Sequence, residues 1–130
     1  MPGAEWQRIE PGHGVCFRIP PDAHRGPGTP VDSSAGYFDG EAYRIAYDLG
    51  RFPETLDDYA DRPGFARRSR RIGERKATEV AFAPEDEDWG WARILQLELE
   101  PGRTLTLRVS CTGREACGVA DAVFGSVSVD

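Results

Sequence analysis

The sequence has no long apolar segment and no excess of positive charge, and these two absences exclude several classes of protein. No run approaches the roughly 20 consecutive apolar residues of a membrane-spanning helix. The 16 lysines and arginines stand against 22 aspartates and glutamates, which gives a net charge of −6. Binding to nucleic acid or to an anionic membrane surface favours a basic protein. We therefore expect no nucleic-acid partner and no membrane span in this chain.

The sequence lacks a spacing pattern that indicates a catalytic or metal-binding site, although carboxylates are abundant. The spacing of His13, Cys16 and His24 fits no closed zinc site. Ser33 lacks the Gly-x-Ser-x-Gly pattern of a nucleophile elbow. The acidic run Glu85–Asp88 has neither the ligand spacing nor the central glycine of an EF-hand calcium loop. We accordingly expect no catalytic residues, no metal site and no cofactor, and we expect that the protein is not an enzyme.

Cysteine is also rare, and its three copies at positions 16, 111 and 117 leave at least one thiol unpaired within the chain. Cys111 ends a predicted strand, and Cys117 falls in the helix predicted to follow it. This short link can bring the two α-carbons within disulfide range, and we predict a Cys111–Cys117 bridge if the protein reaches an oxidising compartment. The alternative is a pair of buried free thiols, which are common as small core residues.

Positive charge is concentrated in one segment of this acidic chain. The sequence has a single lysine, and the cations crowd one predicted hairpin. These residues could dock an acidic partner or a phosphate-bearing ligand. The alternative is an exposed hairpin whose arginines pair with carboxylates on neighbouring strands. The candidate binding residues are Arg67, Arg68, Arg70 and Arg71, with Arg75 and Lys76 beside them.

Two tryptophans form a second candidate binding feature. Trp89 and Trp91 flank Gly90, and strand alternation would place both indoles on the same face. Exposed, they would form a recognition platform for a sugar or a peptide. Buried, they would cap the hydrophobic core.

The fold is easier to predict than the function. Residues 92–99 and 104–111 alternate apolar and polar side chains, as strands half-buried on a core do. Pro101-Gly102 predicts a tight turn between them, and Gly73-Glu74 predicts another within the arginine-rich hairpin. Helices are predicted over residues 53–60 and 113–124, the second starting at a capping box of Thr112 and Glu115.

These elements predict one α+β domain over residues 14–130, preceded by an N-terminal arm over residues 1–13. An antiparallel sheet of about six strands with flanking α-helices would form its core.

The order of elements resembles a known family. The features that carry the resemblance are a first strand ending at Pro20-Pro21, Val31-Asp32-Ser33, the strand Tyr43–Gly50, the hairpin at Ile72-Gly73-Glu74-Arg75, Ser110-Cys111 before a helix, and Val123–Val127. Together they resemble uncharacterised bacterial exported or lipoprotein domains with a PsbP-like α/β/α sandwich, over most of residues 14–129. Members of that architecture include photosystem assembly factors and a Ran-binding nuclear-import protein. The resemblance implies an accessory or binding role more often than catalysis.

From these observations we expect a non-catalytic, extracytoplasmic accessory or binding domain of a bacterium, whose partner is another protein or an envelope component. Met1-Pro2-Gly3 has neither the basic start nor the apolar core of a signal peptide. A periplasmic or secreted location therefore requires a leader that is absent from this sequence. The alternative is a cytoplasmic interaction protein of the inhibitor or immunity type, and a small hydrolase is the third hypothesis.

Overall fold

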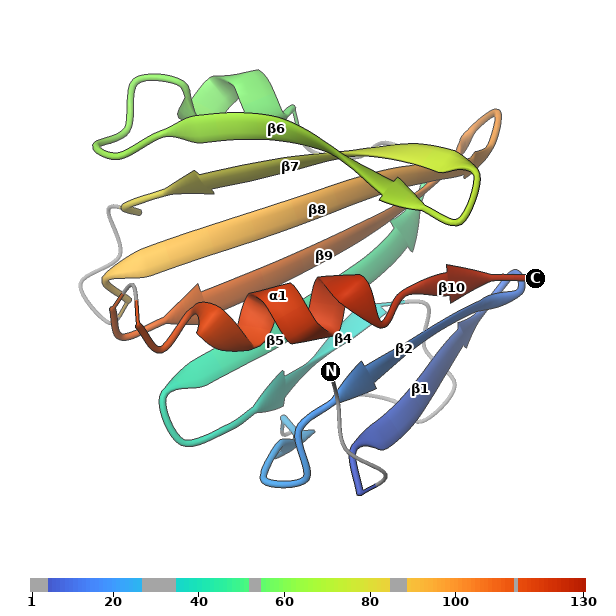
Figure 1. Ribbon diagram of the computed structural model, residues 1–130, viewed down its shortest axis with the longest axis horizontal. Coiled ribbons are helices and arrows are strands. Elements are labelled where there is room, and N and C mark those ends of the chain that lie inside the picture. The colour runs from blue at the N-terminus through green and yellow to red at the C-terminus, as the bar shows by residue number, and fades with distance from the viewer. Residues whose placement is uncertain (1–4, 27–34, 52–54, 85–88, 114) are drawn as a thin grey trace.

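The computed structural model describes residues 5–26, 35–51, 55–84, 89–113 and 115–130 (Figure 1). The acidic run Glu85–Asp88 and the Val31-Asp32-Ser33 segment lie outside the described residues. In chain order, the elements are β1 (Gln7–Gly12), β2 (Val15–Ile19), β3 (His24–Arg25), β4 (Ala35–Asp39), β5 (Tyr43–Gly50), the 3-10 helix η1 (Leu56–Tyr59), β6 (Ala66–Ile72), β7 (Arg75–Phe82), β8 (Trp91–Glu100), β9 (Arg103–Cys111), α1 (Gly118–Gly125) and β10 (Ser128–Val129).

The strands form two antiparallel sheets. The larger sheet has seven strands in the order β3-β4-β5-β9-β8-β7-β6, and the smaller has three in the order β1-β2-β10. The predicted α+β fold, with about six strands in one sheet and flanking α-helices, is therefore wrong. The described part of the chain is mostly β and contains one short α-helix. None of its helices is long and apolar enough to cross a membrane.

The predicted helices are shorter than expected for local reasons. Of the helix predicted over residues 53–60, the described residues 55–60 contain only the 3-10 turn η1, where Leu56 is buried against the sheet. The second helix begins at Gly118 instead of residue 113, and no side chain caps its N-terminus. Residues 115–117 form a turn, and Cys117, which is bonded to Cys111 at the end of β9, is the N-cap residue of the helix.

The central meander follows its alternating pattern, as predicted. Leu95, Leu97, Leu105 and Leu107 are all fully buried on one face of β8 and β9. Burial of these side chains is the main contribution to the free energy of folding here.

The two predicted tight turns are confirmed. Gly73-Glu74 alone joins β6 to β7, and Pro101-Gly102 alone joins β8 to β9. Gly73 and Gly102 take positive φ angles of 61° and 84°, which favour glycine. The β6–β7 turn fixes the register of that hairpin, so that Arg68 lies opposite Glu79.

Each face of the large sheet is covered differently. Helix α1 and the small sheet pack on one face and enclose the larger core cluster (Figure 1). On the other face, Leu56 and Tyr59 of η1 pack over Val80, Phe82 and Ile94. The candidate site lies where α1 meets β6, β7 and β8.

Candidate binding site

A buried carboxylate on β7, Glu79, is the centre of the candidate site. Only 3% of its side chain is exposed, although glutamate is almost never fully buried unless it is paired. Arg68 and Arg93 donate hydrogen bonds to its carboxylate, each with one contact of 3.1 Å. The Arg70 Nε lies 3.1 Å from its other oxygen. Three strands, β6, β7 and β8, therefore meet at a single carboxylate.

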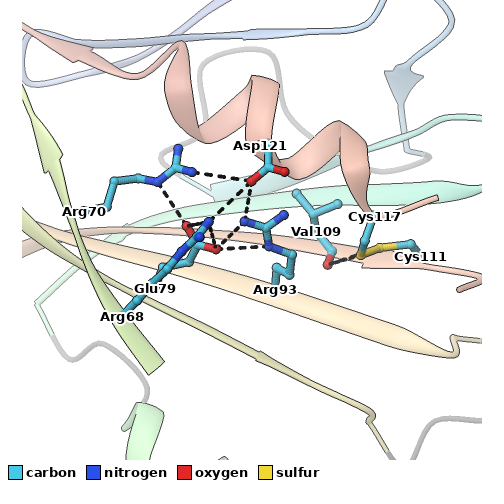
Figure 2. A network of polar contacts seen from close by, with 8 residues as sticks. All are labelled: Arg68, Arg70, Glu79, Arg93, Val109, Cys111, Cys117 and Asp121. Atoms are coloured by element: carbon cyan, nitrogen blue, oxygen red, sulfur yellow. Dashed lines mark hydrogen bonds and ion pairs between the residues drawn. A yellow bond between two sulfur atoms is a disulfide. The ribbon is translucent and has the colours of Figure 1, made fainter. Parts of the chain in front are cut away.

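A second carboxylate joins the same three arginines from helix α1. Asp121 Oδ1 lies 2.7 Å from Arg93 Nη2, 3.4 Å from Arg68 Nη2 and 3.5 Å from Arg70 Nη2. Figure 2 shows Asp121 facing the guanidinium groups from the helix, with Glu79 below it on the sheet. We call these five residues the arginine cluster. It ties α1 to β6, β7 and β8, and its three cations exceed its two carboxylates by one charge.

Burial within the arginine cluster is uneven. The side chains of Arg93 and Arg70 are 11% and 21% exposed, whereas those of Arg68 and Asp121 are 57% and 59% exposed. The guanidinium carbons of Arg93 and Arg70 also lie 5.6 and 5.9 Å from the centre of the Phe124 ring. At these distances the ring face attracts the cations. The cluster thus has a fixed inner part and a solvent-facing part that includes Arg68.

The ion pairs of the cluster shift the pKa values of Asp121 and Arg93 further from neutral pH. The hydrogen bond from Arg93 lowers the pKa of the Asp121 carboxyl below its usual value of 3.8. Burial disfavours the charge on Arg93, but hydrogen bonds to Asp121 and Glu79 outweigh it and raise the Arg93 pKa above its usual value. Asp121 and Arg93 are therefore charged across the physiological pH range.

A cavity of about 350 Å³ lies beside the cluster. It is lined by Arg68 and Arg93, by Trp91, and by small residues that include Ala66, Ala81 and Gly118. Glu79 and Asp121 also line it, so its walls combine two guanidinium groups and their two carboxylate partners with an indole and small side chains. The indole and the small side chains give the cavity an apolar part beside these paired charges.

The four predicted arginines divide between the two faces of β6. Arg68 and Arg70 face α1 and belong to the arginine cluster. Arg67 forms an ion pair with Asp57 of η1 on the opposite face. Arg71 is exposed. Among the described residues, the only polar contact of its side chain is a weak hydrogen bond of 3.5 Å to the Glu74 carbonyl.

The two predicted tryptophans lie in different surroundings. Trp91 lines the cavity and packs against the main core. Trp89 is half-buried, and the Arg44 guanidinium lies 5.8 Å from the centre of its ring. Arg44 alternates along β5 with the core residues Tyr43 and Ile45, so it projects from the opposite face of the sheet. The structure therefore places only Trp91 at the candidate site.

The cysteines are arranged as predicted for an oxidised protein. Cys111 and Cys117 form a disulfide across a sequence separation of six residues, with their α-carbons 5.4 Å apart. Cys16 is a buried free thiol in β2. Cys117 also lines the cavity, and Figure 2 shows the disulfide on the same side of the sheet as the arginine cluster.

Sequence reasoning missed three members of the cluster, namely Glu79, Arg93 and Asp121. A signal existed for Glu79, because a two-residue turn at Gly73-Glu74 places Arg68 directly opposite it. Arg93 and Asp121 carried no comparable signal. Their positions depend on the register of β7 with β8 and on how α1 packs on the sheet.

Acid is expected to weaken the cluster through Asp121. Since its pKa is lower in the folded protein than in the unfolded chain, its ion pairs contribute fully above about pH 5. The contribution is lost as pH falls through the usual carboxyl pKa of 3.8 and on through the lower pKa of the folded state, because the unfolded chain takes up the proton first. Denaturant unfolding across this interval should show a smaller loss of stability for Asp121→Asn than for the wild type. Asp61→Asn, at an exposed acid outside the cluster, is the control and should follow the wild type. Equal slopes for all three proteins would contradict the assignment.

Comparison with known proteins identifies a shared fold. No protein-family model matches the sequence, and no curated protein matches it. Eight chains of solved structures match the structure. One is the solution structure of cyanobacterial PsbP (CyanoP) from Synechocystis sp. PCC 6803, with a TM-score of 0.58 and 13% sequence identity. The match covers 99% of this chain and 95% of that one, so the similarity extends over the whole fold.

Proposed function

We propose that the protein is a non-catalytic accessory or binding domain of a bacterium that works outside the cytoplasm and docks on another protein or on an envelope component. The observation that carries the proposal is the arginine cluster beside the cavity. General acid–base catalysis needs a group whose pKa lies near the working pH. The pKa values of Arg93 and Asp121 are shifted away from neutral pH instead. Groups with such pKa values suit fixed charges that position a partner.

Two further observations support the proposal. The Cys111–Cys117 disulfide is typical of proteins in an oxidising compartment. The fold shared with cyanobacterial PsbP agrees with the accessory role that the resemblance of the sequence implies. The arginines of β6 supply the binding surface in this proposal.

The thiol state of the protein in its native host tests the compartment. Cells are quenched in acid, denatured and alkylated with and without prior reduction, and the intact mass of the protein is then measured. One alkylated thiol before reduction and three after are expected, because only Cys16 is free. A Cys16→Ala variant should show none before reduction and two after.

Three alkylated thiols without reduction would contradict the extracytoplasmic placement. The cytoplasmic inhibitor or immunity-type protein would then be the better hypothesis.

A further inference from the structure

We propose that the outer edge of β6 binds an acidic, extended segment of a partner protein, which adds to the seven-stranded sheet as an eighth strand. The inference rests on the proposed function and specifies its docking surface and the chemistry of its partner. Three features of β6 support it: an open edge, a high positive charge on both faces, and a neighbouring cavity.

The edge of β6 is long and regular. β6 ends the sheet and pairs, among the described strands, only with β7, through seven consecutive residue pairs without a bulge (Figure 1). In an antiparallel ladder, every second residue of an edge strand directs its N–H and C=O away from its neighbour. Five of its residues are exposed, namely Ala66, Arg67, Arg68, Ser69 and Arg71. Seven residues span about 24 Å, enough for a partner strand of typical length.

The two edges of the large sheet differ in length. At the opposite edge, β3 has only two residues, His24 and Arg25. A very short edge strand is one way in which proteins prevent unwanted strand pairing. β6 has seven residues and lacks that protection. It therefore offers much the longer template for strand addition.

The charge on β6 selects the partner. Between residues 67 and 76 there are six cations and one carboxylate, in a chain whose net charge is −6. Arg68 and Arg70 project on the α1 side, and Arg67 and Arg71 on the η1 side, so both faces of an added strand would meet guanidinium groups. Main-chain hydrogen bonds would hold such a strand, and carboxylates at alternate positions would set its specificity.

Part of this charge is unbalanced in the free protein. Arg71 lies directly opposite Lys76 in the β6–β7 ladder, and both are exposed. Like charges at directly opposed positions destabilise a sheet. A carboxylate bound next to Arg71 would relieve this repulsion.

The same charge argues against a second copy of this chain as the occupant. Two β6 edges paired with each other would bring arginines against arginines, which opposes self-association. Charged side chains on an edge strand oppose such pairing, and β6 carries four arginines in seven residues. An acidic partner strand, by contrast, would pair carboxylates with these arginines.

The cavity lies at one end of the β6 edge, so the two ends of the edge differ. Ala66 and Arg68, near the start of β6, line it together with Trp91. A side chain of the added strand that faces α1 at this end would lie over the cavity. An acidic segment with one apolar side chain at that position would therefore use both features.

The inference is tested with a synthetic nine-residue peptide that alternates glutamate and threonine, carries a fluorophore and has blocked ends. Its affinity is measured by fluorescence anisotropy for the wild type and for two charge-reversed variants. Arg67→Glu with Arg71→Glu reverses the edge without touching the arginine cluster. Arg8→Glu with Arg51→Glu changes the net charge equally at exposed sites elsewhere, and each pair includes one arginine that forms an ion pair.

The edge variant is expected to bind the peptide at least about tenfold more weakly than the wild type, and the matched variant within about twofold. The same peptide N-methylated at its five central nitrogens should also lose at least about tenfold, since it cannot donate main-chain hydrogen bonds to β6.

Three results would overturn the inference. They are the absence of measurable binding to the wild type, equal losses in the two charge-reversed variants, and full affinity of the N-methylated peptide. The last would show docking by charge without strand addition. None of these results changes the thiol state in the host, so failure of the edge and failure of the extracytoplasmic placement are separately visible.

Discussion

Replacing Glu79 by glutamine is expected to lower the free energy of unfolding by about 3 kcal/mol. The change keeps the shape of the side chain but removes the charge that Arg68, Arg70 and Arg93 share. Arg93 and Arg70 are the costly partners, because they are mostly buried and water cannot replace the lost carboxylate. Asp121 would remain as the only anion for three cations.

Urea unfolding at pH 7 measures this effect. Glu98→Gln is the matched control, since Glu98 is an exposed glutamate on the adjacent strand β8, outside the cluster. It should change the free energy of unfolding by less than about 0.5 kcal/mol. Equal stability of the two variants would contradict a structural role for the cluster. If Glu79→Gln were as stable as the wild type, the buried carboxylate would not be needed to hold the three arginines.

Reducing the Cys111–Cys117 disulfide is expected to lower the free energy of unfolding by about 2 kcal/mol. The loop that it closes is short, with a sequence separation of six residues, so it restricts the unfolded chain only modestly. The bond also fixes the entry into α1, because Cys117 is the N-cap residue of that helix. Loosening this end would free the helix that carries Asp121.

The comparison is made with and without a thiol reductant on the same proteins. The wild type should lose stability in reductant, whereas a Cys111→Ala, Cys117→Ala double variant should be unaffected by it. A Cys16→Ala variant should respond as the wild type does, since Cys16 is free. An unchanged wild type in reductant would mean that the disulfide contributes nothing to stability.

The parts of the fold that could be predicted are those set by local sequence. Alternation placed Leu95 and Leu97 in the core, and glycine turns fixed the two tight hairpins. The number of strands was underestimated because several are short or polar. β1 contains Pro11 and Gly12 and is largely exposed, so its sequence resembles a loop. Its pairing with β2, together with Ile9 against the core, makes it a strand.

The candidate site was predicted in part, for the same reason. The crowding of arginines on one hairpin was visible in the sequence, and Arg68 and Arg70 do lie at the site. The pairing of Arg68 with Glu79 follows from the turn alone. Arg93 and Asp121 reach the cluster through β7–β8 pairing and the packing of α1 on the sheet. Local periodicity does not encode these long-range arrangements.

The account depends most on the claim that β6 is an open edge that accepts an acidic strand. Amide hydrogen exchange of the full chain, with and without a saturating amount of the glutamate–threonine peptide, tests it most directly. We expect slower exchange at alternate residues of β6, at those whose N–H groups point away from β7, and little change in β1, β3 or β10. Protection centred on another strand, or no protection of β6 in the bound protein, would contradict the claim.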